Sequence, residues 1–302
     1  MYTVEEGHDA RTSISRIEWF SPAIKRTKRV NVILPVDYAM SATPCCVLFM
    51  LHGYGGNRST WLQRTQLLEY VRDMRLIVVL PESGRRWFIN DHEGNRYEDY
   101  LLNEVVPCIE ERFNTIPGRH GRAIGGFSMG GAAALFLTLR HPDLFSVVLS
   151  HSGAFEAPLR VGDPYEAYRD DPELLMPSIR SHECVWGKPG SDTRRAYDPY
   201  ELIRNTDRSF SIRVYVDVGL DDYERVVRMN RNVHRALLEY GIAHEYNEFP
   251  GGHDWDYVDR ALPTSLAFLC RHLPCQSKVA PDLVTGAKNC GKDKIPARKE
   301  VQ

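Results

Sequence analysis

Ser128 lies in a stretch whose spacing favours nucleophilic chemistry. It is the centre of a Gly-x-Ser-x-Gly pattern that runs from Gly126 to Gly130. A short apolar run, 123–127, precedes the serine, and an alanine-rich run, 132–139, follows it. In such a strand–turn–helix context the serine hydroxyl is exposed on a sharp turn, and glycines are needed where strand and helix nearly touch. The pattern predicts a nucleophile at Ser128 rather than an ordinary strand-to-helix turn.

A serine hydroxyl needs a base, and the base needs an acid that orients it. The chain order serine, acid, histidine that suits this turn is satisfied here. Of the 11 histidines, His253 alone lies in a glycine-framed loop after the last expected strand. Asp221 and Asp222 follow the strand before it. Spacing does not choose between them: we expect one to hold His253 and the other to cap the next helix or face solvent.

Two backbone N–H groups are expected to stabilise the oxyanion of the reaction. The first belongs to Met129, at the start of the helix that follows the serine. The second comes from the glycine-rich loop 52–57, where Tyr54 is the best candidate. That loop lacks the lysine and the spacing of a phosphate-binding loop. His52, at its start, is expected to be a hydrogen-bonded scaffold residue.

The elements that must position these residues alternate along the chain. Eight apolar or alternating runs predict strands, at 14–20, 29–34, 46–51, 76–80, 123–127, 146–150, 212–218 and 243–249. Helical spacing between them, for example at 60–74 and from 100 to 113, predicts covering helices. The expected fold is α/β, a mostly parallel eight-stranded sheet with helices on both faces and the site at the carboxyl ends of the strands.

Two segments depart from this alternation of expected strands and helices. Residues 156–208 contain six prolines, many charges and short helical fragments, and predict a cap-like insertion over the site. Residues 275–302 are polar and rich in lysine, and predict a disordered tail. We therefore expect one α/β-hydrolase domain over 1–274, with the insertion as a partial cap.

Composition restricts the partners. The chain has 302 residues and a formal net charge of −2, which gives no reason to expect a nucleic acid or a membrane as partner. Its 7 cysteines show no metal-ligand spacing, and a disulfide framework is not expected. The polar start does not resemble a signal peptide, so the predicted location is cytoplasmic. We expect no cofactor and no metal, and a small-molecule ester as substrate. The oligomeric state, a homo-oligomer included, stays open.

Several stretches together resemble the esterase D type of α/β-hydrolases, which includes S-formylglutathione hydrolases, tributyrin esterases and feruloyl esterases. The similarity spans about 20–273, and the chain is most similar to the tributyrin-esterase-like members. The stretches that carry it are 20–23, 30–35, 51–57 with Trp61, 97–100, 125–131, 141–145, 219–223 and 252–255.

The resemblance implies roles for individual residues. In the family the acid precedes an aromatic residue, which favours Asp222, before Tyr223, over Asp221. It also implies substrate contacts by Trp87 and Asn90, and by Trp255. Relatives that act on S-formylglutathione usually carry a cysteine in the oxyanion loop, where this chain has tyrosine and glycines at 54–56.

The resulting hypothesis is a serine carboxylesterase for short-chain acyl esters, which uses Ser128, His253 and Asp222 and forms an acyl-enzyme. Alternatives are an S-formylglutathione hydrolase, a feruloyl or cinnamoyl esterase, and an acyltransferase. A catalytically silent binding protein on the same scaffold is the alternative from another class; labelling by a fluorophosphonate distinguishes it from an enzyme.

Overall fold

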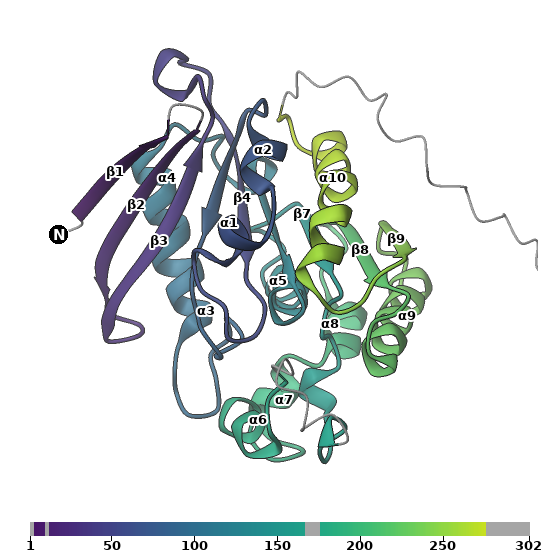
Figure 1. Ribbon diagram of the computed structural model, residues 1–302. Coiled ribbons are helices and arrows are strands. Elements are labelled where there is room, and N and C mark those ends of the chain that lie inside the picture. Colours follow the sequence, from purple (N-terminus) through teal and green to yellow (C-terminus); the bar gives the residue numbers. More distant parts are fainter. Residues whose placement is uncertain (1–2, 10–11, 167–175, 276–302) are drawn as a thin grey trace, which may run out of the picture.

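A nine-stranded sheet forms the centre of the computed structural model, which describes residues 3–9, 12–166 and 176–275 (Figure 1). The order across the sheet is β1-β2-β3-β5-β4-β6-β7-β8-β9. The strands are β1 Thr3–Asp9, β2 Thr12–Ser21, β3 Arg26–Leu34, β4 Cys46–Leu51, β5 Leu76–Leu80, β6 Arg122–Phe127, β7 Val147–His151, β8 Arg213–Gly219 and β9 His244–Phe249.

The first three strands are antiparallel to their neighbours, and every pair from β5 to β9 is parallel. The central strands β4, β5, β6 and β7 are buried at every residue. Helices cover both of their faces, which is why they are continuous apolar runs in the sequence. Since these strands are parallel, their carboxyl ends lie at one edge, where the loops that carry the candidate residues meet.

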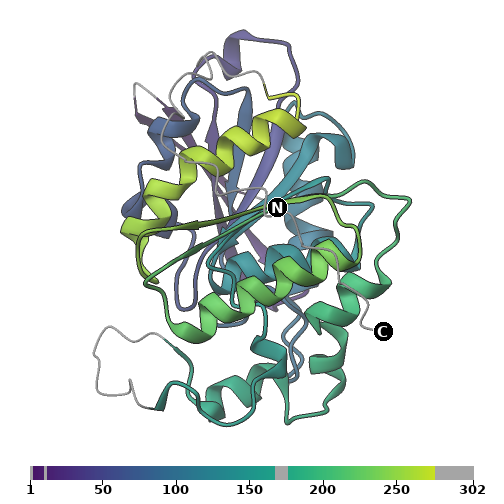
Figure 2. The same ribbon diagram turned by 90° about the vertical axis from the view of Figure 1, so that its right-hand side faces the viewer.

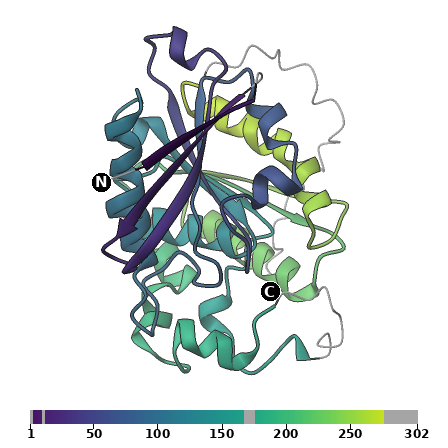
Figure 3. The same cartoon turned by 60° about the vertical axis from the view of Figure 1, so that its left-hand side comes forward.

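Helices cover the sheet in two layers. Figure 2 shows α10 on one side of the sheet and α9 on the other, and Figure 3 shows α4 opposite α1, α2 and α10. Two apolar clusters fill the space between these layers and the sheet. The α-helices are α1 Thr60–Arg64, α2 Leu67–Val71, α3 Tyr97–Asp99, α4 Val106–Arg112, α5 Met129–Arg140, α6 Ile179–Trp186, α7 Asp192–Ala196, α8 Pro199–Asn205, α9 Glu224–Glu239 and α10 Trp255–His272. Short helical turns are η1 Tyr38–Met40, η2 Tyr100–Val105, η3 Arg119–Gly121 and η4 Ala157–Leu159.

The expected fold class is confirmed, and the eight expected strands correspond to β2–β9. The expected strand number is one too low, because β1 pairs with β2 at the edge of the sheet. Its sequence, TVEEGHD, lacks the apolar alternation that would predict a strand.

The single helix expected over 60–74 is two short helices, α1 and α2. Between them the Gln66 backbone N–H donates to Asp259 of α10 at 2.7 Å, and the Thr65 hydroxyl donates to the Trp61 carbonyl at 2.6 Å. The break therefore depends on a contact with a distant helix.

The segment 156–208 contains η4, α6, α7 and α8, apart from the undescribed residues 167–175. Figure 1 shows α6 and α7 beyond one end of the sheet, next to the loops that follow the parallel strands. The tail expected from residue 275 onward lies outside the described residues, except for Cys275. Among the described helices, none is long and apolar enough to span a membrane.

Candidate active site

Ser128 occupies a sharp turn between β6, which ends at Phe127, and α5, which begins at Met129. Its backbone has φ +53° and ψ −111°. A positive φ is costly for a residue with a side chain, and it persists only where the surroundings enforce it. The Ser128 N–H donates to the His151 carbonyl of β7 at 2.9 Å, and its own carbonyl accepts from Ala154 and Ala132, each at 3.0 Å. These main-chain bonds hold the turn.

Two glycines allow β4 to pass close to the turn. A Cβ added to Gly126 would lie 2.6 Å from the Leu51 carbonyl oxygen, and one added to Gly130 would lie 2.3 Å from the same oxygen. Real Cβ atoms do not come this close to a backbone oxygen. The glycines on either side of Ser128 are thus required by the contact with β4.

His253 and Asp222 complete a chain of hydrogen bonds that begins at Ser128. His253 Nε2 lies 2.8 Å from Ser128 Oγ, and His253 Nδ1 lies 2.8 Å from Asp222 Oδ2. The Asp222 side chain is fully buried, and that of His253 is 11% exposed. Asp222 Oδ1 also accepts from the Tyr223 N–H at 2.6 Å. The carboxylate thereby fixes the tautomer in which Nε2 faces the serine as an acceptor.

The loops that carry Asp222 and His253 pack directly against each other. The strand β8 ends at Gly219, where a Cβ would lie 2.2 Å from the Gly251 carbonyl oxygen. Asp221 bridges the same two loops, since its N–H donates to Gly251 O at 2.9 Å and its Oδ2 accepts from Gly251 N at 3.2 Å. His253 is followed by Asp254, which caps α10 by accepting from the Tyr257 N–H at 2.7 Å.

The expected oxyanion donors both border Ser128. Met129 is the first residue of α5, and the first N–H groups of a helix have no acceptor within the helix. Tyr54 follows the β4 strand, and it lines both cavities beside the serine. The guanidinium of Arg85 lies 5.5 Å above the Tyr54 ring.

His52 holds the loop that contains Tyr54. Its Nδ1 lies 2.7 Å from the Gly53 carbonyl, and its Nε2 accepts from the Ser83 N–H at 3.0 Å. These partners require a neutral ring with its proton on Nδ1. Burial lowers the pKa of His52 to about 4, so the ring stays neutral in this position near pH 7.

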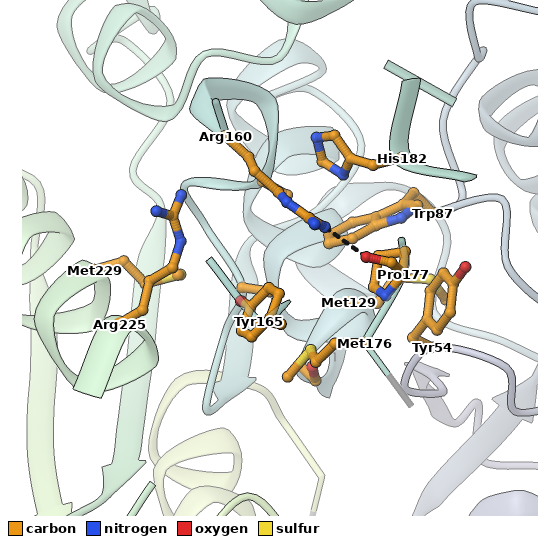
Figure 4. Close-up of a pocket in the computed structure, with 13 residues that line it drawn as sticks. Tyr54, Trp87, Met129, Arg160, Tyr165, Met176, Pro177, His182, Arg225 and Met229 are labelled. Atoms are coloured by element: carbon orange, nitrogen blue, oxygen red, sulfur yellow. Dashed lines mark hydrogen bonds between the residues drawn. The ribbon is translucent and has the colours of Figure 1, made fainter. Parts of the chain in front are cut away.

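Ser128 lines two cavities. The inner pocket, of about 30 Å³, lies between the serine and the insertion (Figure 4). The outer groove, of about 680 Å³, extends past His253. The inner pocket is lined mostly by apolar and aromatic side chains, among them Trp87, Met129, Tyr165, Met176 and Met229. The outer groove is lined in part by Asn57, Thr60, Gln63, Tyr223 and Trp255.

The three residues expected to contact substrate fall in different places. Trp87 lines the inner pocket, and Trp255 lines the outer groove. The Trp255 ring packs edge-on against Trp61 and Phe127, each at a centroid distance of 5.0 Å. Asn90 is not among the lining residues. Its amide donates to Asp99, the last residue of α3, at 3.0 Å.

Sequence reasoning missed the part of the inner pocket that the insertion supplies. Arg160, Tyr165, Met176 and His182 come from this segment, and Met229 comes from α9. Proline-rich segments carry no periodicity that indicates which side chains face a site. The helical spacing of His182 with Val185 and Trp186 was the available sequence signal for His182. Among the described residues, no three His, Cys, Asp or Glu side chains are grouped to hold a metal ion.

Comparison with known proteins identifies the family of the chain. Residues 21–269 match the Esterase family over most of the chain. The chain belongs to the Esterase family. It is therefore a carboxylic ester hydrolase, and its expected resemblance to the esterase D type group is confirmed.

This esterase is 26% identical to the Acetyl esterase of Caldicellulosiruptor saccharolyticus over 269 residues, which are 86% of the chain and 98% of the relative. Two S-formylglutathione hydrolase structures show the same fold. The one from Staphylococcus aureus has a TM-score of 0.70 at 24% identity and covers 87% of this chain and 99% of its own. The one from Agrobacterium tumefaciens has a TM-score of 0.73 at 17% identity, with coverage of 89% and 98%.

Proposed function

We propose that this esterase is a serine carboxylesterase that hydrolyses esters of short acyl groups. The observation that carries the proposal is the pair of 2.8 Å contacts that link Ser128 to His253 and His253 to Asp222. Distances in this range allow proton transfer between the serine and the imidazole. The order of the three residues along the chain is the one that this fold uses.

The first half of the reaction forms an acyl-enzyme. Ser128 Oγ attacks the acyl carbonyl carbon as His253 Nε2 takes the hydroxyl proton. The N–H groups of Met129 and Tyr54 stabilise the oxyanion that develops, a type of contact worth about 3–4 kcal/mol in other serine hydrolases. The bond to the alcohol then breaks, and His253 gives the proton to the leaving alcohol oxygen. Asp222 stabilises the imidazolium during these steps.

Water completes the cycle. It attacks the acyl-enzyme carbonyl as His253 takes one of its protons, and the acid leaves as Ser128 recovers its proton. In this proposal the acyl group occupies the inner pocket, because Met129 and Ser128 both border it. The alcohol occupies the outer groove, whose wall includes His253. The segment 156–208 then acts as a partial cap over the acyl group.

The size of the inner pocket supports a short acyl chain. A volume of about 30 Å³ is small for a ligand pocket, which favours a small acyl group. The relative named Acetyl esterase agrees with that restriction. A formyl thioester would also fit, so S-formylglutathione is the second candidate substrate. A feruloyl group exceeds the volume, and we rank a feruloyl esterase below both.

The test is a panel of 4-nitrophenyl esters from acetate to octanoate, with S-formylglutathione and methyl ferulate included. We expect the highest kcat/KM for acetate or butyrate. A fluorophosphonate probe should label the wild-type protein and not Ser128→Ala, and Ser128→Ala should lose about 10⁶-fold in kcat. Labelling or turnover that persists in the folded Ser128→Ala variant would exclude Ser128 as the nucleophile. A wild-type protein that neither hydrolyses an ester nor reacts with the fluorophosphonate would be a catalytically silent scaffold.

A further inference from the structure

Cys270 and Cys275 form a pair of thiols at the C-terminal end of α10. The Cys275 thiol donates to Cys270 Sγ, and the two sulfur atoms lie 3.3 Å apart. Neither cysteine is in a disulfide, so both carry a free thiol. A disulfide places its sulfur atoms about 2.05 Å apart. The two thiols therefore already lie close to the separation at which they could be joined.

A turn at the end of α10 brings the two thiols together. The helix ends at His272, and the Leu273 N–H still donates to the Leu269 carbonyl at 2.8 Å. Pro274 has no N–H and cannot continue the helix. The Cys275 N–H then donates to the Leu273 carbonyl at 2.8 Å. The contact between the sulfur atoms is thus supported by the local course of the backbone.

The two thiols differ in exposure and in acidity. Cys270 is half-buried, whereas Cys275 is 3% exposed and belongs to one of the two apolar clusters. The hydrogen bond from Cys275, with the nearby charge of Arg271, lowers the pKa of the Cys270 thiol below its ordinary value of 9.0. The same hydrogen bond, with burial, raises the pKa of Cys275. Cys270 therefore supplies the thiolate that an oxidant in solution meets first.

Other cysteines of the described chain lack this combination of properties. Cys46, the first residue of β4, is fully buried, and burial raises the pKa of its thiol to about 12. Cys184 is half-buried like Cys270, but its hydrogen bond to Glu93 raises the pKa of its thiol. The thiols of both residues therefore stay protonated at neutral pH, and a protonated thiol is a poor nucleophile.

We infer that Cys270 and Cys275 form an oxidative modification site, at which a peroxide converts the two thiols into a reversible disulfide. The Cys270 thiolate attacks one oxygen of hydrogen peroxide, the O–O bond breaks, and the hydroxide that leaves takes up the former thiol proton as water. The Cys275 sulfur then attacks the sulfur of the Cys270 sulfenic acid, whose S–O bond breaks. The hydroxyl leaves with the Cys275 proton as a second water. Two thiols are oxidised, and one peroxide is reduced to two waters.

The disulfide would tie Cys275, which precedes the segment 276–302, to α10 by a covalent bond. It would also protect Cys270, because a sulfenic acid without a thiol neighbour is oxidised further to irreversible products. Figure 1 shows α10 running from the region of the site toward the opposite end of the molecule from α6 and α7. Cys270 lies 15 residues, or about 22 Å, along α10 from Trp255. The inference is therefore independent of the proposed esterase reaction.

The experiment treats the full chain with hydrogen peroxide and counts the free thiols after denaturation. We expect the wild-type protein to fall from seven thiols to five, and a dithiol reductant to restore seven. Trypsin cuts after Arg271, between the two cysteines, so mapping without reduction should find their two peptides joined. Cys275→Ser cannot form this disulfide. In that variant dimedone, which reacts with sulfenic acids, should label Cys270.

Cys184→Ser is the matched control, because it removes a half-buried thiol whose partner is Glu93. It should fall from six thiols to four, with Cys270 again joined to Cys275. A wild-type protein that keeps seven thiols would overturn the inference, as would a disulfide that joins Cys270 to Cys46 or to Cys290. Dimedone labelling of Cys184 in place of Cys270 in the Cys275→Ser variant would also overturn it.

Discussion

Asp221 and Asp222 are consecutive residues that bind the same loop through different atoms. Asp222 Oδ2 lies 2.8 Å from the His253 ring, whereas Asp221 Oδ2 accepts from the Gly251 N–H at 3.2 Å. One carboxylate therefore faces the base, and its neighbour fastens the loop on which the base lies. These contacts distinguish Asp221 from Asp222, which sequence spacing alone could not do.

Substitutions of the two aspartates should have very different effects. We expect Asp222→Asn to lower kcat by about 10⁴-fold, because an amide favours the wrong tautomer of His253. Asp221→Asn should lower it by less than about tenfold, since it weakens one exposed hydrogen bond. Hydrolysis of 4-nitrophenyl acetate by both folded variants measures the difference. Equal losses would assign the orienting role to the loop and not to Asp222.

Acyl-chain preference should depend on Met229, a buried residue of α9 that lines the inner pocket. Met229→Ala removes three non-hydrogen atoms from the pocket wall. We expect the ratio of kcat/KM for hexanoate over acetate to rise by about tenfold, as a few buried methylene groups can produce. Met40→Ala, at a residue that is 84% exposed, is the control and should leave the ratio unchanged. An unchanged ratio in Met229→Ala would place the acyl chain elsewhere.

We expect the free energy of unfolding to decrease at acidic pH because His52 becomes protonated. Its pKa is about 4 in the folded protein, below the ordinary value of 6.5, because of burial. The unfolded chain therefore binds more protons between these values. The stability contributed by the neutral ring is fully present above about pH 6.5 and is lost as the pH falls toward 4, by about 3 kcal/mol in total.

Urea unfolding at several pH values tests this. His52→Gln should lose up to about 1.4 kcal/mol per pH unit of the slope between pH 4 and 6.5, although it is less stable at pH 7. The control His120→Gln should keep the full slope. A slope unchanged in His52→Gln would mean that folding does not lower the pKa of His52.

Most of the fold could be predicted because its central strands are buried on both faces. β4 and β5 are continuous apolar runs, and each ends where a polar loop begins. The edge strand β1 could not be predicted, because a strand with one neighbour does not need an apolar face. The division of α1 from α2 could not be predicted either, since it depends on Asp259 from the other end of the chain.

The candidate site also contains residues that the sequence could predict and residues that it could not. Ser128 and His253 were predictable, because each lies in a glycine-bordered loop directly after a strand. Asp222 needed the resemblance to a family. Asn90, expected at the substrate, lines neither cavity and donates to Asp99, and a short polar loop has no periodicity that gives the direction of a side chain. His182 was missed as a lining residue of the inner pocket, since its place there depends on the folding of the segment 156–208.

The contacts that hold Ser128 come almost entirely from the main chain. The Leu51 carbonyl packs on both flanking glycines, and the His151 carbonyl binds the serine N–H. Amino-acid replacement in β4 or β7 changes side chains and leaves these carbonyls in place. The Ser128 turn is thus insulated from side-chain replacement in β4 and β7, whereas the inner pocket contains side chains of the segment 156–208, among them Tyr165, Met176 and His182. Such a division would let a lineage acquire new acyl preferences without losing the reaction.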